Sequence, residues 1–483
     1  MKKILLIFIL TSFIFSCKNV NHKIDNKQAK NTIEANQKNP IASDSIYEKA
    51  VIYEVNIRQY SSEGTINAFV KDIPELKKMG IKILWVMPIF PISEVNRKAT
   101  GDVFTSQIKD SIERKKYLGS PYAVADYTKV NPDFGTKEDL KKLIEIAHQN
   151  GMLVILDWVA NHTGWDHPWI AAHPEYYTTN KEGKLTDPLN EDGSSKGWQD
   201  VADLNYNNAG LHKAMIDDMK YWLTTANVDG FRCDVAGEVP LSFWQEAIPQ
   251  LRKVKPIFML AEAWEPALLK DDLFDMCYGW ESHFLMADIA KGKKNVSDWD
   301  QYIKKVDTMY EPDDIIMNFT ENHDENSWKG TVKETFGDAA EVMAVLTYMS
   351  KGMPLIYSGQ EYGLNHRLKF FEKDSIPKTK GKYFEFYKKL GQLKNQNIAL
   401  NGGKYPVDYQ RIKTTDDKNI LVFKRDKNGQ TILFIANLSN QERHFKIHVD
   451  ASYKDAMSNQ LVKLKKDKEI TLPKWGYKIL LKQ

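Results

Sequence analysis

Four acidic residues each lie at or just after the end of a short apolar run. They are Asp157 in LVILDWVANH, Asp234 in VDGFRCDVAGE, Glu262 in IFMLAEAW and Asp324 in IIMNFTENHD. Short apolar runs that alternate with helical segments are typical of buried parallel strands. A carboxylate after such a strand lies at the C-terminal rim of a β/α barrel, where these folds place their chemistry. Several carboxylates on one rim would suit glycoside hydrolysis, which uses a carboxylic acid and a carboxylate that flank the bond.

Two of these acids have neighbours that favour different roles. Arg232 precedes Asp234 by two residues and shares its face of the strand, so its guanidinium would keep Asp234 ionised as a nucleophile. Glu262 lies between Ala261 and Ala263, and apolar neighbours would raise its pKa, as a general acid requires. Neighbouring barrel strands are about 4.8 Å apart. The two carboxyls can therefore approach the spacing of roughly 5–5.5 Å that retaining glycosidases use.

Other polar residues accompany these two acids. Asp324 follows His323 and could stabilise positive charge on a sugar, while His162, in the same segment as Asp157, could bind a ring hydroxyl. Taken singly, an aspartate at a strand end is more often a helix cap, and a histidine there is usually structural. Only the ordered set, one acid per strand, predicts a catalytic site.

The elements that must position these residues alternate between strand and helix. Predicted helices include 66–79, 137–150 and 208–226, and a polar loop is expected at 93–120. The predicted strands are, in chain order, VIYEVNIRQY, IKILWVMP, MLVILD, VDGFRCD, PIFMLAE, FDMCYGW, DIIMNFT and MPLIYS. Eight strand–helix repeats over roughly 350 residues predict an α/β fold, a (β/α)8 TIM barrel at 46–400.

Two further regions differ from the barrel pattern. Residues 164–206, after strand three, contain several tryptophans and little helical periodicity, which predicts a small inserted domain beside the rim. From residue 401 to 483, short apolar runs alternate with turn signals and predict a C-terminal antiparallel β-sandwich. Asn428-Gly429 between two of these runs is a strong signal for a two-residue hairpin.

The N-terminus predicts export. Residues 1–17, MKKILLIFILTSFIFSC, resemble a bacterial lipoprotein signal peptide that ends at a lipidated Cys17; an ordinary signal peptide is the alternative. Residues 18–45 are polar and predict a disordered tether. The expected location is the outer membrane or cell envelope, with the protein held by its lipid and facing either the periplasm or the cell surface.

Composition excludes some classes of protein. The net charge of +3 over 483 residues argues against a nucleic-acid binder, which would carry a clustered basic surface. Beyond Cys17 there are only Cys233 and Cys277, which are expected to be buried free thiols without metal-ligand spacing.

Together these residues resemble the α-amylase family, glycoside hydrolase family thirteen, over about 46–483. The strand-three and strand-four motifs match 157–162 (DWVANH) and 230–234 (GFRCD), and the strand-seven motif matches 322–324 (NHD). Glu262 matches the strand-five acid. Further matches are 80–88 on strand two, 202–205 (ADLN) before strand four, and Gly352, Met353, Pro354, Tyr357, Gly359 and Glu361 around strand eight.

The resemblance implies roles for particular residues. Asp234 would be the nucleophile, Glu262 the acid/base and Asp324 the transition-state stabiliser. Tyr122, His162, Arg232 and His323 would line the subsite of the attacked sugar, in an α-glucosidic, usually α-1,4, linkage.

The resemblance also implies a structural calcium at Asn161 and Asp203. Glu238 departs from the family pattern, which often has a histidine four residues after the nucleophile, and this departure weakens the expectation of calcium.

Several activities share this catalytic set. The leading hypothesis is a retaining α-glucan hydrolase that cleaves starch-like polysaccharides or maltooligosaccharides. The alternatives within the family are an exo-α-glucosidase, a neopullulanase or cyclomaltodextrinase, and a transglycosylase. A non-catalytic glycan-binding protein is a further alternative, which the intact acids disfavour. The loops at 93–120 and 164–206 would decide product length.

Overall fold

The computed structural model describes residues 42–483. The expected signal segment, its Cys17 and the tether up to residue 41 lie outside the described residues. Within the described part of the chain, no helix is both long enough and apolar enough to cross a membrane.

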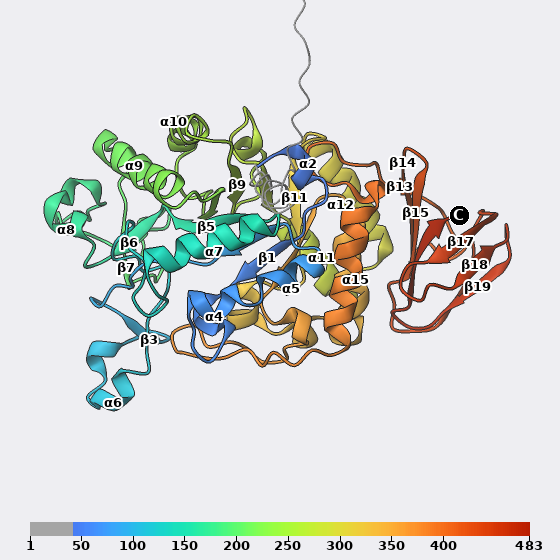
Figure 1. The fold of residues 1–483 in the computed structure, drawn as a ribbon, viewed down its shortest axis with the longest axis horizontal. Helices are drawn as coiled ribbons and strands as arrows, with labels where there is room; N and C mark the ends of the chain where they lie inside the picture. The colour runs from blue at the N-terminus through green and yellow to red at the C-terminus, as the bar shows by residue number, and fades with distance from the viewer. Residues whose placement is uncertain (1–41) are drawn as a thin grey trace, which may run out of the picture. The chain divides into compact units, whose positions relative to one another are not determined.

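Eight parallel strands close into a barrel (Figure 1), which confirms the predicted fold class. Going round the barrel, the order is β1, β12, β11, β10, β9, β8, β5 and β2. Every residue in these strands is buried, which explains why they are continuous apolar runs without alternation. Their bounds are β1 Ile52–Val55, β2 Ile83–Val86, β5 Leu153–Val159, β8 Gly230–Asp234, β9 Phe258–Ala261, β10 Met276–Tyr278, β11 Ile315–Asn318 and β12 Met353–Tyr357.

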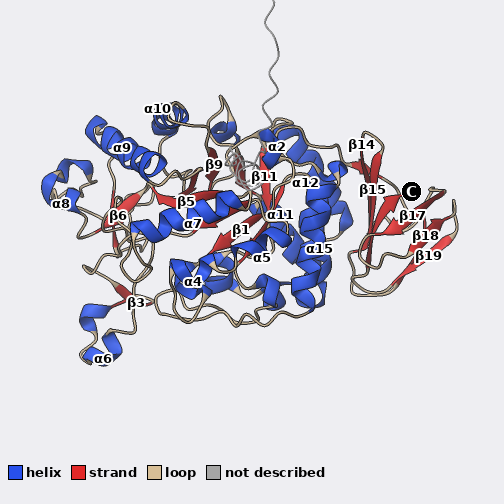
Figure 2. Ribbon diagram, in the orientation of Figure 1, coloured by secondary structure: helices blue, strands red, loops and turns tan. Residues whose placement is uncertain are grey.

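Helices cover the outside of the barrel, and α7 lies against β5 (Figure 2). α7 begins with a capping box between Thr136 and Asp139 and ends at Gln149, and it buries one apolar face. The helical bounds are α4 Ile66–Val70, α5 Ile73–Lys78, α7 Lys137–Gln149, α9 Ala209–Thr225, α10 Leu241–Arg252, α11 Trp280–Ala290, α12 Val296–Met309, α13 Val332–Phe336, α14 Ala340–Met349 and α15 Lys382–Gln396.

Two predicted elements near the start of the barrel were wrong. The first strand ends at Val55, and Ile57–Tyr60 forms the short helix α3 because the Asn56 side chain accepts the Gln59 N–H and caps it. The helix predicted at 66–79 is divided into α4 and α5. Pro74 lies in the first turn of α5 and has no N–H to donate, so a single helix cannot continue through it.

Two segments expected to lack regular structure contain some. The loop at 93–120 includes β3 Lys98–Thr100, β4 Val103–Phe104, a 3-10 helix at Thr105–Gln107 and α6 Ser111–Arg114. The tether predicted at 18–45 overlaps α2 Asp44–Tyr47. Tyr47 is buried and its ring centre is 4.8 Å from that of Phe258 on β9, so this helix packs against the barrel.

The segment inserted after strand three is bounded by its own small sheet. β6 His162–Gly164 pairs antiparallel with β7 Val201–Asp203. Between them lie α8 Pro168–Ala172 and a 3-10 helix at Pro174–Tyr176, with long irregular stretches. The β6–β7 pair fixes both ends of the insertion at the barrel rim.

The C-terminal region forms antiparallel sheets, as predicted. One sheet has the order β13-β14-β15-β20-β17-β18, and β16 pairs with β19 in a second. β14 and β15 are joined at Asn428-Gly429, whose φ angles of 48° and 82° are those of a tight hairpin turn. The bounds are β13 Gln410–Arg411, β14 Ile420–Lys427, β15 Gln430–Asn437, β16 Arg443–Lys446, β17 Ala451–Asp455, β18 Leu461–Leu464, β19 Glu469–Leu472 and β20 Tyr477–Lys482.

A buried arginine joins the C-terminal sheet to the barrel. Arg425 of β14 donates hydrogen bonds to the carbonyl oxygens of Met349 (3.1 Å), Ser350 (2.9 Å) and Asn401 (2.6 Å). These carbonyls lie at the end of α14 and just before the C-terminal sheets, so the guanidinium satisfies backbone groups from both regions.

Candidate active site

Arg232 lies fully buried at the rim and contacts three carboxylates. Its Nη1 donates to Oδ1 of Asp157 at 2.8 Å and to Oδ1 of Asp234 at 2.9 Å. Its Nη2 lies 2.7 Å from Oε2 of Glu262, in an ion pair whose angle does not make a hydrogen bond. One guanidinium therefore holds the expected nucleophile and the expected acid side by side.

A glycine allows the two strands that carry these acids to approach closely. Gly230 begins β8 with a φ of +143°, and a Cβ at this position would lie 1.9 Å from the carbonyl oxygen of Phe258 on β9. Only glycine tolerates this conformation and this contact. The close pairing of β8 with β9 brings Asp234 and Glu262 to adjacent positions on the rim.

The surroundings of Glu262 differ from the prediction. Apolar neighbours were expected, but the Glu262 carboxylate accepts the Val235 N–H at 2.8 Å and pairs with Arg232. Trp264, two residues later, is 56% exposed. Alternation along the strand explains the difference, because flanking residues face away from Glu262 while residues from β8 face it. Val235 has a φ of 37°, an unfavourable value for a β-branched residue, directly after Asp234.

A chain of buried polar groups lies beneath the predicted catalytic acids. Glu54 on β1 contacts Nδ1 of His323 at 2.6 Å, and Nε2 of His323 lies 2.7 Å from the hydroxyl of Tyr122. Tyr122 in turn donates to Oδ2 of Asp157 at 3.1 Å. Burial lowers the pKa of His323, but the charges of Asp324 and Glu54 outweigh it and raise this pKa to about 9. The imidazolium can then donate from both nitrogens and fix the Tyr122 ring.

Among the four rim acids, Asp157 differs from Asp234, Glu262 and Asp324. Asp157 is fully buried and also accepts the Trp85 Nε1–H at 3.0 Å, so it positions Arg232 and Tyr122 and does not face the cleft. Sequence reasoning missed Glu54. Its signal was an acid inside the apolar run of the first strand.

The residues predicted to bind sugar gather around one cavity. Six of the seven predicted catalytic and sugar-binding residues line a cavity of about 410 Å³, namely Tyr122, His162, Asp234, Glu262, His323 and Asp324. The seventh, Arg232, lies beneath this cavity. Burial lowers the pKa of His162 to about 3, so its imidazole is neutral and can both donate to and accept from a hydroxyl.

The carboxyls predicted to be catalytic influence one another. Burial raises the pKa of Asp234, Arg232 opposes this, and the charge of Glu262 raises it further. Burial also raises the pKa of Asp324, which His323 opposes. The expected effect of Arg232 on Asp234 is therefore present but is outweighed by burial. The charge of Glu262 raises the pKa of both Asp234 and Asp324, as like charges in one site do.

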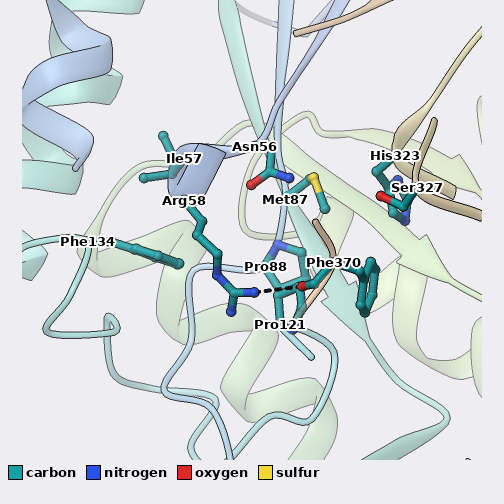
Figure 3. Close-up of a pocket in the computed structure, with 10 residues that line it drawn as sticks. All are labelled: Asn56, Ile57, Arg58, Met87, Pro88, Pro121, Phe134, His323, Ser327 and Phe370. Carbon is teal, nitrogen blue, oxygen red and sulfur yellow. Dashed lines mark hydrogen bonds between the residues drawn. The ribbon is translucent and has the colours of Figure 1, made fainter. Parts of the chain in front are cut away.

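Arg58 fixes two loops that meet at this cavity. It extends from α3, and Nη1 donates to the carbonyl oxygens of Gly119 and Phe370, both at 2.9 Å. Figure 3 shows the Arg58–Phe370 bond beside a small cavity that His323 also lines. The Phe370 ring is nearly parallel to that of Tyr122, 6.4 Å between centres. Arg58 therefore determines where the wall behind Tyr122 lies.

The residues expected to bind calcium, Asn161 and Asp203, lie on neighbouring segments, and calcium itself stays a prediction. The backbone carbonyl oxygen of Asn161 accepts the Leu204 N–H, so its side-chain amide is not used in this bond, and burial raises the pKa of Asp203 to about 6. Glu238 pairs with Lys196 at 2.6 Å, and the charge of Lys196 also lowers the pKa of Asp203. Calcium takes six to eight oxygen ligands. Residues 42–483 contain no cluster of three or more acids, histidines or cysteines that could hold a metal ion, so a calcium ion here would take its remaining ligands from amide and backbone oxygens or water.

A closed parallel barrel with paired carboxylates and an arginine at its C-terminal rim is the architecture of a barrel-type glycoside hydrolase. Comparison with known proteins supports this class of enzyme. Residues 30–460 match the model of the α-amylase catalytic domain. Alpha-amylase 3 of Dictyoglomus thermophilum is 25% identical over 496 residues, which cover 88% of this chain and 92% of that protein.

Other relatives carry related names. A cyclomaltodextrinase of Thermoanaerobacter pseudethanolicus is 24% identical over 409 residues, 78% of this chain and 64% of that protein. The structure of maltogenic α-amylase AmyB from Thermotoga neapolitana superposes with a TM-score of 0.78 at 27% identity, covering 90% of this chain and 99% of that one. An α-amylase structure from Lactobacillus plantarum gives 0.77 at 28% identity, with coverage of 91% and 100%. The chain belongs to the α-amylase family and is an α-glucan hydrolase.

Proposed function

We propose that the chain cleaves α-1,4-glucosidic bonds within maltooligosaccharides or starch-like chains, with retention of the anomeric configuration. The observation that carries this proposal is the shared guanidinium of Arg232, which brings Asp234 and Glu262 together at the rim. Contact of both acids with one guanidinium favours the short carboxyl separation of retaining enzymes, about 5–5.5 Å, over the wider one that inversion requires.

The chemistry divides into two steps. In the first, a carboxylate oxygen of Asp234 attacks C1 of the glucosyl unit, while protonated Glu262 gives its proton to the glycosidic oxygen and the leaving chain departs with a free hydroxyl. In the second, the Glu262 carboxylate takes a proton from water, the resulting oxygen attacks C1, and the bond to Asp234 breaks. Asp324, at the edge of the cavity, stabilises the positive charge that develops on the sugar ring.

The shape of the cleft supports internal cleavage. The cavity of about 410 Å³ holds the nucleophile, and a second groove of about 1560 Å³ begins at Glu262 and Asp324. A chain can thus be bound on both sides of the scissile bond. Cyclomaltodextrinase and maltogenic activities remain alternatives, since two relatives carry those names.

The test is hydrolysis of maltoheptaose by residues 18–483, with products and anomers followed by NMR. Short oligosaccharides released first as α-anomers are expected. Glucose as the sole product would indicate an exo-glucosidase, products longer than the substrate would indicate transfer, and β-anomers would refute retention. Absence of turnover, with maltoheptaose bound, would favour a glycan-binding protein.

The proposal includes a lipid anchor on Cys17, for which the sequence alone is the support. A cell-envelope hydrolase held in this way would act on glucans that reach the cell. Expression of the full chain and of Cys17→Ser, followed by membrane fractionation, tests this. Wild-type protein in the membrane fraction and released variant are expected, and equal release of both would exclude the anchor.

A further inference from the structure

Exposed aromatic side chains gather in the larger groove. Three of the exposed large apolar residues of the described chain line it, namely Trp264 (56% exposed), Phe284 (54%) and Trp328 (49%). Exposed apolar residues that cluster in one groove mark a binding surface, whereas scattered ones are ordinary. Trp280, which is partly buried, lies beside Phe284 in the same groove.

Trp280 and Phe284 form a fixed platform at the start of α11. They are four residues apart, so they share one face of the helix, and their rings stack at 5.7 Å with planes 17° apart. Tyr278 on β10 stacks on Trp280 at 5.4 Å. The Tyr278 hydroxyl accepts a hydrogen bond from Nε of Arg232 at 3.1 Å. Tyr278 therefore links the platform to Arg232, which also contacts the carboxylates of Asp234 and Glu262.

Polar groups flank this platform. Glu281 of α11 pairs with Lys305 of α12 at 2.7 Å, both are more than half exposed, and Gln301 of α12 also lines the groove. An apolar face bordered by carboxylate, ammonium and amide groups suits a sugar, whose ring face packs on an aromatic ring while its hydroxyls form hydrogen bonds.

The catalytic residues determine which end of a glucan would reach the platform. Asp234 lines the smaller cavity only, whereas Glu262 and Asp324 line both spaces. The sugar that Asp234 attacks therefore lies in the smaller cavity. The leaving chain, whose oxygen receives the proton of Glu262, must extend into the larger groove.

We infer that the Trp280–Phe284 platform binds the reducing-end segment of an α-glucan chain, beyond the sugar unit that Glu262 protonates. This inference rests on the proposed hydrolysis of α-glucans. The groove is continuous from Glu262 to Phe284, and this continuity argues for the substrate itself as the occupant. The consequence is that long leaving chains are preferred, so bonds nearer the non-reducing end are cleaved.

The test is Phe284→Ala, compared with Phe284→Trp and with a control, Tyr405→Ala. Tyr405 is also an exposed aromatic residue, 64% exposed, but it does not line the groove. Maltoheptaose carrying ¹⁸O at its reducing end reports which bond is cleaved, and thermal unfolding verifies that each variant folds.

Phe284→Ala is expected to move the preferred cleavage site toward the reducing end and to lower kcat/KM about 2- to 12-fold for maltoheptaose, the value of one lost aromatic contact. The loss for maltotriose is expected to be smaller. Phe284→Trp should restore the wild-type pattern. An unchanged cleavage pattern in folded Phe284→Ala would overturn the inference. The inference would also fail if Phe284→Ala abolished self-association of the protein but kept the wild-type cleavage pattern.

Binding to an inactive enzyme separates this inference from the proposed function. In the Asp234→Asn background, Phe284→Ala is expected to weaken maltoheptaose binding by a similar factor in calorimetry. If the wild type does not hydrolyse glucans, the proposed function fails. Equal maltoheptaose affinity with and without Phe284 refutes the platform alone.

Discussion

Glu321 is a buried acid whose ionisation should make stability fall as the pH rises. The Glu321 side chain is 1% exposed. Its Oε1 accepts hydrogen bonds from the Asn326 side chain at 2.9 Å and from the Val332 N–H at 3.2 Å. Its Oε2 has no hydrogen-bond partner. Burial raises its pKa from 4.5 to about 8, although the two hydrogen bonds oppose the shift. We expect Glu321→Gln to remove this pH dependence, since glutamine keeps the acceptor oxygen and cannot ionise.

The magnitude follows from linkage. The folded-state pKa is raised, so between pH 4.5 and 8 the unfolded chain loses the Glu321 proton while the folded protein keeps it. Each pH unit in this window therefore lowers the free energy of unfolding by about 1.4 kcal/mol. From pH 5 to pH 8, the wild type should lose about 3.5 kcal/mol relative to Glu321→Gln, because the slope is smaller near each pKa. Below pH 4.5, the two proteins should differ by less than about 1 kcal/mol.

The assay is urea unfolding of both proteins at pH 5, 6, 7 and 8, followed by tryptophan fluorescence. Comparison at each pH cancels the contributions of other groups. An exposed acid provides the control, and Glu182→Gln should follow the wild type throughout. A constant difference between wild type and Glu321→Gln across this range would refute the reasoning, because it would mean that the folded protein accommodates the charge.

Three further predictions follow from the site and its supports. Glu262→Gln should lower the rate of maltoheptaose hydrolysis about 10²- to 10⁴-fold. The first step on a glucosyl fluoride should be largely spared, because fluoride leaves without a proton. An equal loss on both substrates would contradict the role of Glu262 as the acid. Arg58→Met should destabilise the fold by about 1–3 kcal/mol in urea and raise KM, because Phe370 loses its anchor; an unchanged KM would show that the loop holds itself. Gly230→Ala should prevent accumulation of soluble protein, because its Cβ would lie 1.9 Å from the Phe258 oxygen, and a normal yield with native circular dichroism would contradict this.

The main elements of the barrel could be predicted because their signals are local. Each strand is an apolar run buried on both faces, and most helix ends carry a cap, a glycine or a change of periodicity. The predictions failed where one side chain decided the outcome. Asn56 caps α3 inside an apolar run, and Pro74 divides a helix whose overall pattern is continuous.

The position of the candidate acids at the rim could be predicted for a related reason. Parallel strands end at one rim, so a residue's position at a strand end predicts its place in the site. The environment of each acid could not be predicted this way. Glu262 faces Val235 and Arg232 on the neighbouring strand, not its own alanines, and cross-strand register is a property of the closed sheet.

The sequence by itself determined the order of strands and helices, the family, and which carboxylates lie at the rim, because these depend on local pattern and chain order. Only the tertiary structure decided that Asp157 supports the site and does not face the cleft, that Glu54 orients His323, and that Lys196 pairs with Glu238. The physical reason is that hydrogen bonds and charge pairs join residues far apart in the chain. Their energies depend on burial and distance, and closure of the barrel sets both.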